Sequence, residues 1–160
     1  MHYLLFVSQY QKKIGNMINK PYKEKSVLLI DDEPEYVQWL YDYLVAKGFE
    51  VDMAESVGDA LKFADATGYR LYLVDLNIPA GAWTSPSPMP EIYSQYKGLN
   101  VIRYVRSQGN SGVRVVAYSA HENAEIHAAI DNLYCNYVVK GRARDIKAEI
   151  ETVLQHDPKA

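Results

Sequence analysis

Short apolar runs alternate with amphipathic stretches along most of the chain. The first run, Val27 to Ile30, has no polar interruption and predicts a buried strand. From about Glu35 to Lys47 the apolar residues recur at helical spacing, and Gly48 is placed to end that helix. The same alternation predicts further strands at about 49–53, 71–76, 113–118 and 137–139, and further helices at about 56–68, 99–107, 123–132 and 146–154.

Five strand–helix units of this kind predict an α/β fold, in which helices cover both faces of a parallel sheet. The third run, Leu71 to Leu76, is almost continuously apolar, which is typical of a strand covered on both sides. Ser56 is expected to cap the helix that follows the second strand. A length of 160 residues suits one domain with a full core.

Polar residues stand where four of these strands end. Asp31 and Asp32 follow the first strand, Asp75 ends the third, Ser119 the fourth and Lys140 the fifth. The carboxyl ends of parallel strands share one edge of a sheet, so we expect these side chains to meet. Carboxylates suit Mg²⁺ and can form an aspartyl phosphate, while an ammonium and a hydroxyl stabilise phosphoryl oxygens. The set predicts a phosphoryl-transfer site, although each member alone also fits a solvated turn or a helix cap.

Composition and charge narrow the class of protein. The net charge of -3 provides no broad basic surface for nucleic acid. The one cysteine, Cys135, cannot form an internal disulfide, so we expect a reducing, cytoplasmic location and an inert residue on a strand. No run is long enough to span a membrane, and the early YLLFV cluster lacks the flanks of a signal peptide.

Two segments lie outside the alternating pattern. Residues 1–25 are interpreted as an N-terminal extension, either a loose tail or a partner-binding arm, before a domain at 26–156. After the third strand, an insert at about 80–97 is rich in Pro and Ser and is expected to be a long loop. Its aromatic residues, Trp83, Tyr93 and Tyr96, suggest a lid over the carboxylates or a docking patch, and a solvated spacer remains open.

Four stretches together, VLLIDDEP, LYLVDLNIP, VVAYSA and YVVK, resemble the CheY-like receiver domain of two-component response regulators. The resemblance runs from about Val27 to Leu154 and implies a flavodoxin-like doubly wound sheet with strand order 2-1-3-4-5. The chain departs from the family pattern at three places: Gly141 replaces a proline after Lys140, the turn glycine is displaced to Gly98, and Leu133 and Tyr134 replace a small pair.

The resemblance also implies a role for each site residue. Asp75 would be the phosphoacceptor, Lys140 would pair with it or with the phosphoryl group, and Ser119 would contact that group. The implied Mg²⁺ ligands are Asp32 and Asp75 directly, Asp31 through a bound water, and the backbone carbonyl of Asn77. Tyr137 would be an aromatic switch, with a plain core tyrosine as the alternative.

We therefore expect a signalling module and not an enzyme. A sensor histidine kinase or phosphotransfer protein would supply the phosphoryl group in a phosphorelay, and the output would be a changed surface for an unknown downstream protein or a homodimer. The module would be stand-alone or part of a longer protein. Alternatives are a phosphorylation-independent receiver and an aspartyl phosphatase of the haloacid-dehalogenase type, which would need an Asp where Asn77 stands. A flavodoxin relative is disfavoured because the carboxylates would repel a flavin phosphate.

Overall fold

The computed structural model describes residues 20–86 and 88–156. They form a five-stranded sheet in the order β2-β1-β3-β4-β5, and every neighbouring pair is parallel. This confirms the predicted flavodoxin-like topology. The strands are β1 (Tyr22–Ile30), β2 (Glu50–Ala54), β3 (Gly68–Asp75), β4 (Val115–Ser119) and β5 (Asn136–Val139).

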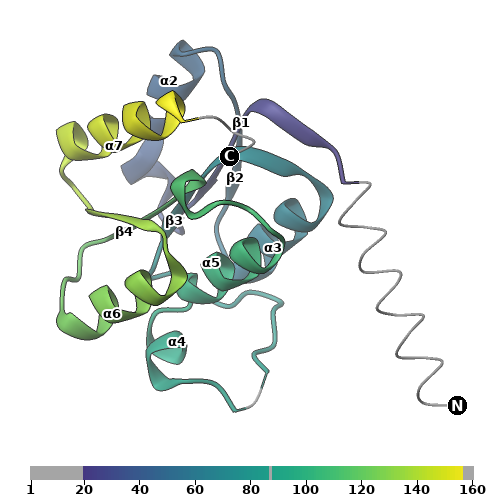
Figure 1. The fold of residues 1–160 in the computed structure, drawn as a ribbon, viewed down its shortest axis with the longest axis vertical. Coiled ribbons are helices and arrows are strands. Elements are labelled where there is room, and N and C mark those ends of the chain that lie inside the picture. The colour runs from purple at the N-terminus through teal and green to yellow at the C-terminus, as the bar shows by residue number, and fades with distance from the viewer. Residues whose placement is uncertain (1–19, 87, 157–160) are drawn as a thin grey trace, which may run out of the picture.

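Helices cover both faces of the sheet, as Figure 1 shows. The longer ones are α2 (Gln38–Ala46), α3 (Val57–Ala66), α5 (Gly98–Ser107), α6 (Ala124–Leu133) and α7 (Ala143–Gln155). Shorter ones are α4 (Glu91–Gln95) and the 3-10 helices η1 (Pro34–Val37) and η2 (Gly112–Arg114). None of the helices in the described part of the chain has the length and apolar character of a membrane span.

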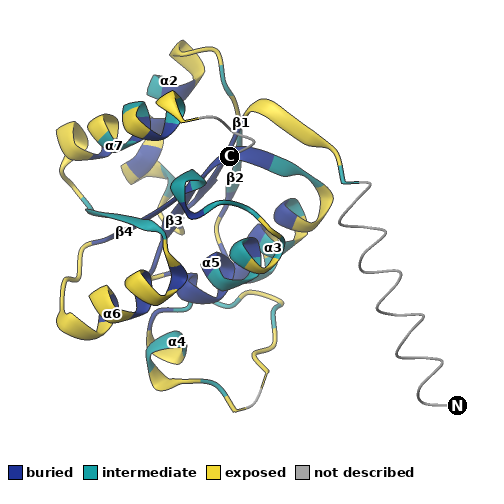
Figure 2. Ribbon diagram, in the orientation of Figure 1, coloured by how far each residue is buried: buried dark blue, intermediate teal, exposed yellow. Residues whose placement is uncertain are grey.

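The sheet separates two apolar cores. Along β1, Leu28 and Ile30 face the core shared with α3, α5 and α6, whereas Val27 and Leu29 face the core shared with α2 and α7. In Figure 2, buried residues accordingly fill β4, almost all of β3 and the second half of β1, together with the inner sides of the helices, whereas the edge strands β2 and β5 are mostly intermediate. A sheet covered on both faces needs apolar residues at successive positions, which explains the continuous runs in the sequence.

Strand β1 begins five residues earlier than expected. Tyr22 and Lys23 pair with Gly68 and Tyr69 of β3, and the register shifts before Val27. Residues 22–25 are exposed and three of them are charged, which hid this part of the strand from the pattern of apolar residues. Residues 1–19 of the expected N-terminal extension lie outside the described residues.

Local caps match the expectations at two helices, and two finer expectations are wrong. The hydroxyl of Ser56 accepts a hydrogen bond from the N–H of Asp59, and Gly48 has the left-handed φ of 91° that follows a helix end. Cys135 lies in the connection before β5 and not on a strand, and residues 113 and 114, expected to begin the fourth strand, belong to η2, so that β4 starts at Val115. Burial raises the pKa of the Cys135 thiol to about 12, which agrees with an inert residue.

The two ends of the insert contact the domain, its second half contains a short helix, and residues 84–86 between them are exposed. Prolines and serines concealed α4 within it, and the insert's last aromatic residue, Tyr96, is buried. The carbonyls of Pro79 and Ala80 accept hydrogen bonds from the first N–H groups of α3, at 2.9 and 3.0 Å. The solvated-spacer alternative is therefore wrong for both ends of this segment.

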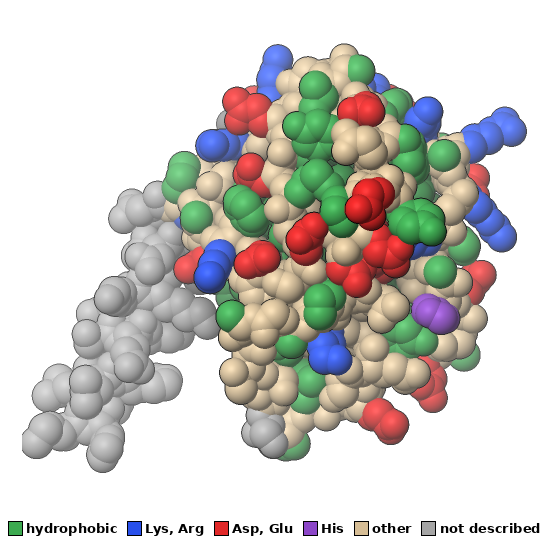
Figure 3. All heavy atoms as spheres, turned by 180° about the vertical axis from the view of Figure 1, so that it is seen from behind, with side chains coloured by type: hydrophobic (Ala, Val, Ile, Leu, Met, Phe, Trp, Pro, Cys, Tyr) green, Lys and Arg blue, Asp and Glu red, His purple; other side chains and the backbone are tan. Residues whose placement is uncertain are grey.

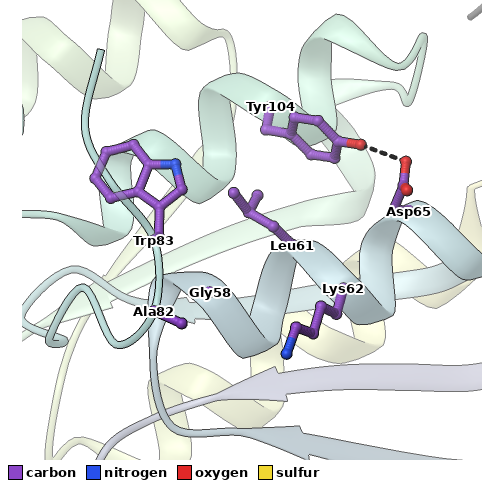
Figure 4. A pocket seen from close by; sticks show the side chains of 7 residues that line it. All are labelled: Gly58, Leu61, Lys62, Asp65, Ala82, Trp83 and Tyr104. Carbon is purple, nitrogen blue, oxygen red and sulfur yellow. Dashed lines mark hydrogen bonds between the residues drawn. The ribbon is translucent and has the colours of Figure 1, made fainter. Parts of the chain in front are cut away.

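Trp83 forms one wall of an open groove between the insert, α3 and α5 (Figure 4). The groove has a volume of about 300 Å³, and Leu61 of α3 and Tyr104 of α5 also line it. Tyr104 donates a hydrogen bond to Asp65 at 2.7 Å at one end of the groove.

Candidate functional site

Three carboxylates meet where β1 and β3 end. Ile30 pairs with Val74, so the next residues, Asp31 and Asp75, are brought side by side by the sheet register. Oxygen atoms of Asp31, Asp32 and Asp75 lie within 4.8 Å of one another. Asp31 and Asp75 are buried, whereas Asp32 is exposed. On the face seen in Figure 3, acidic side chains form a group near the middle of the surface.

The environment of Asp75 favours a neutralising partner. Burial raises the pKa of its carboxyl to about 6, and the nearby Asp31 charge acts in the same direction. The N–H of Asn77 donates to Asp75 Oδ1 at 3.0 Å, and Lys140 Nζ donates to Oδ2 at 2.9 Å. Both bonds lower that pKa, but burial outweighs them.

Lys140 is shared by two of the carboxylates. Its Nζ lies 2.9 Å from Asp75 Oδ2 and 3.0 Å from Asp31 Oδ2. Burial opposes the charge on Lys140, yet its bonds to the two carboxylates raise its pKa above the ordinary value. The chain turns immediately afterwards, at Gly141, where φ is 90°. The glycine that replaces the family proline thus leaves Lys140 within reach of the carboxylates.

The donor set fits a hard divalent cation. Oxygen ligands from carboxylates and from backbone are what Mg²⁺ prefers, and three carboxylates carry more negative charge than Lys140 balances. Asp32 forms no side-chain hydrogen bond or ion pair within residues 20–86 and 88–156, so its oxygens remain available to a metal. Asn77 is exposed beside the cluster.

Ser119 and Tyr137 both contact His121. The hydroxyl oxygen of Ser119, which is fully buried, accepts a hydrogen bond from the N–H of His121 at 3.0 Å. The hydroxyl of Tyr137 donates to the carbonyl of the same residue at 2.9 Å. The His121 ring also lies near Tyr96, with ring centroids 5.9 Å apart. The loop after β4 therefore links the strand-end hydroxyl, Tyr137 and the end of the insert.

One polar contact escaped the sequence analysis. Tyr118, treated there as part of an apolar strand, places its hydroxyl 2.9 Å from Asp31 Oδ2 and 3.1 Å from the carbonyl oxygen of Ile30. Burial and the charges of Asp31 and Asp75 hold the pKa of this phenol well above its ordinary value, so it keeps its proton and donates. The sequence does place a tyrosine directly before Ser119. The alternation of a strand, however, predicts only which face of the sheet Tyr118 occupies and not which group its hydroxyl reaches.

Comparison with known proteins identifies the architecture and the family. The family model described as response regulator receiver domain matches residues 27–151. A comparison with curated proteins found no match. Among solved structures, a CheY-like response regulator receiver domain from Methanospirillum hungatei is 18% identical, with a TM-score of 0.64, and the match covers 82% of this chain and 94% of that one.

Two further structures have the same fold. A two-component response regulator from Clostridium difficile is 16% identical, with a TM-score of 0.63, over 82% of this chain and 97% of that one. The response regulator TrrA from Thermotoga maritima, solved in complex with Mg²⁺ and BeF, is 23% identical, with a TM-score of 0.61, over 81% of this chain and 99% of that one. At these sequence identities, the structural similarity shows a shared fold and no more.

Proposed function

Because the chain belongs to the family of response regulator receiver domains, we propose that it is a phosphoaccepting signalling module in which Asp75 takes the phosphoryl group. The observation that carries this proposal is the cluster of Asp31, Asp32 and Asp75 with Lys140 bonded between two of them. Receiver domains are signalling domains and not classical enzymes, and we place the receiver unit at about 26–156, with its insert at about 80–97.

The donor would be a phosphohistidine of a sensor histidine kinase or of a phosphotransfer protein. A carboxylate oxygen of Asp75 attacks phosphorus, the new O–P bond forms as the P–N bond breaks, and the departing imidazole takes up a proton. Lys140, already 2.9 Å from Asp75, then offers its charge to the phosphoryl oxygens. The hydroxyl of Ser119 is the group proposed to donate to one of those oxygens.

A bound Mg²⁺ would supply positive charge that offsets the phosphoryl and carboxylate oxygens. Its proposed protein ligands are Asp32, Asp75 and the backbone carbonyl of Asn77, with Asp31 acting through a metal-bound water. Asp32 supports this assignment because its side chain is exposed and makes no competing bond to the described residues.

The output is a changed protein-binding surface. If Ser119 turns toward the phosphoryl group, its hydrogen bond with His121 breaks, and the loop that Tyr137 also holds is released to move. The proposed readers are an unidentified downstream protein or a second copy of the chain, with no role for nucleic acid or membrane. The lone Cys135 suits the reducing cytoplasm, which is the proposed location.

The test is intact-protein mass after incubation with acetyl phosphate, with and without Mg²⁺. We expect one phosphoryl adduct that requires Mg²⁺ and is absent from Asp75→Asn. Asp52→Asn is the matched control, since Asp52 is a strand carboxylate outside the cluster, bonded to Tyr69. Failure of the wild-type protein to form an adduct would refute the proposal and favour a receiver that acts without phosphorylation.

A further inference from the structure

Tyr118 reaches the cluster of Asp31, Asp32 and Asp75 from a strand that does not adjoin β1. It stands on β4, and β3 lies between β4 and β1 in the sheet. The side chain is only 1% exposed and packs in the core shared with α2 and α7, on the same side of the sheet as Val27 and Leu29. From there its hydroxyl crosses β3 to Asp31 Oδ2, at 2.9 Å.

Asp31 is a fully buried carboxylate whose orientation depends on the groups that donate to it. The N–H of Glu33 donates to Oδ1 at 2.8 Å. Lys140 and Tyr118 both lie against Oδ2, but Lys140 divides its bonds between Asp31 and Asp75. Tyr118 is therefore the side-chain donor, within the described residues, that Asp31 does not share with the phosphoacceptor.

We propose that Tyr118 is a positioning residue of the metal site: its hydroxyl fixes Asp31 in the metal-binding orientation and leaves Lys140 available to Asp75. The inference rests on the proposed Mg²⁺-dependent function. Neighbouring carboxylates repel one another, so each needs a donor that holds it near the others. Groups that orient metal-binding side chains in this way typically change metal affinity when they are removed.

The Tyr118 hydroxyl has a second acceptor nearby, the carbonyl oxygen of Ile30, so Tyr118 can position Asp31 and still tolerate a movement of that carboxylate. A phenol has one proton, and the carbonyl oxygen of Ile30 lies 3.1 Å from the hydroxyl. When Asp31 turns, Tyr118 can donate to Ile30 without becoming an unpaired buried hydroxyl. Because Ser119 is the next residue of β4, movement of the end of this strand toward Asp75 would directly change the hydrogen bond between Tyr118 and Asp31.

The test compares Mg²⁺ binding by calorimetry in the wild-type protein and in Tyr118→Phe, which removes one oxygen and keeps the ring in the core. We expect the dissociation constant to rise by about tenfold. Tyr69→Phe is the matched control, because Tyr69 is a buried tyrosine that donates to Asp52 at 2.6 Å, away from the cluster. Its Mg²⁺ affinity should equal that of the wild type.

Phosphorylation by acetyl phosphate provides a second readout. In Tyr118→Phe the Mg²⁺ concentration for half-maximal rate should rise by about the same factor. A purely structural tyrosine would lower the melting temperature without this shift. A folded Tyr118→Phe variant with wild-type Mg²⁺ affinity would overturn the inference and leave the proposed function intact, whereas a wild-type protein that binds no Mg²⁺ would refute both.

Nuclear magnetic resonance on the wild-type protein decides the question if the variant does not fold. With tyrosines labelled at the ring carbon that bears the oxygen, Mg²⁺ should shift the Tyr118 signal and leave the Tyr69 signal in place. Equal signals for Tyr118 with and without bound Mg²⁺ would contradict the inference.

Discussion

The carboxylate edge and the groove beside Trp83 both adjoin the segment that follows β3, but they are built in opposite ways. At the edge, polar side chains converge from the ends of separate strands, and Lys140 joins two of the carboxylates. In the groove, apolar side chains from α3, α5 and the insert surround open space of about 300 Å³. The register of the sheet sets the positions of the carboxylates at the edge, whereas the shape of the groove depends on how the insert packs against α3 and α5.

The two regions meet at two places, which makes the comparison testable. Gly98, where the insert returns to the domain, lies against the backbone of Asp75. His121, in the loop that Ser119 and Tyr137 hold, touches Tyr96 at the end of the insert. We expect substitutions that change charge to have their main effect at the carboxylate edge, and substitutions that change packing to have theirs at the groove. Substitutions at the two junctions should affect both regions.

The largest expected effect is at Lys140. In Lys140→Met, two buried carboxylates lose a shared cation, so the free energy of unfolding of the metal-free protein should fall by about 3 kcal/mol. Mg²⁺ should restore more stability to this variant than to the wild type, because it replaces the missing positive charge. Phosphorylation should nevertheless slow, because methionine offers no positive charge to the phosphoryl oxygens at Asp75. Urea unfolding with and without Mg²⁺, together with the adduct assay, checks these outcomes.

Lys62 supplies the matched lysine in the other region. It is exposed at the groove, so Lys62→Met should change stability by less than about 0.5 kcal/mol and leave Mg²⁺ binding alone. Equal losses in the two variants would mean that charge at the carboxylate edge has no special importance.

The next largest effect is the pH dependence of the metal-free protein. Burial raises the pKa of Asp75 to about 6, above its ordinary value of 3.8, so the folded state binds the proton more tightly than the unfolded chain. Stability from this group is therefore present below about pH 4 and lost as the pH rises through about 6. The loss should approach about 3 kcal/mol, and Asp75→Asn should lack it. Urea titrations in a chelator at several pH values measure the difference, and parallel curves would contradict the assignment.

The same contrast explains what the sequence could and could not predict. Asp31, Asp75, Ser119 and Lys140 were placed at one edge because each follows an apolar run, and parallel strands align such positions. The hydroxyl of Tyr118 was missed because its acceptor lies two strands away in the sheet, a distance that periodicity does not encode.

The insert was less predictable for a physical reason. A five-residue helix such as α4 has no periodic signature, and the prolines around it predict a loop. The start of the insert is held by hydrogen bonds from α3, and α4 lies against α5 and α6, so the groove beside Trp83 depends on contacts that local sequence does not encode. The early start of β1 was hidden similarly, because Lys23 is exposed and polar although it pairs with β3.

Gly98→Ala should produce a smaller effect that reaches both regions. A Cβ at this position would lie 2.2 Å from the carbonyl oxygen of Asp75 and 2.7 Å from the Cα of Leu76, so the backbone must shift. We expect a loss of about 1–3 kcal/mol in unfolding free energy, with weaker Mg²⁺ binding because Asp75 is displaced. Gly68→Ala is the control, since its Cβ would meet only ordinary contacts, the nearest at 3.4 Å from the Tyr22 ring. An unchanged Mg²⁺ affinity in Gly98→Ala would show that the insert can move without disturbing the site.

Apart from the control variants, the smallest effect on stability should come from His121→Ala, which probes the second junction alone. Ser119 and Tyr137 bond to the backbone of residue 121, so both bonds survive, and only the ring contact with Tyr96 is lost. Stability should change by less than about 1 kcal/mol, and the phosphorylation rate should not change. The shift of the Tyr96 signal on phosphorylation, followed by nuclear magnetic resonance, should shrink. His127→Ala, which removes a ring near Tyr137 instead, should retain it. If His121→Ala also retains the full shift, the phosphorylation site and the insert communicate through the backbone at Gly98, where Asp75 and the start of α5 are in direct contact.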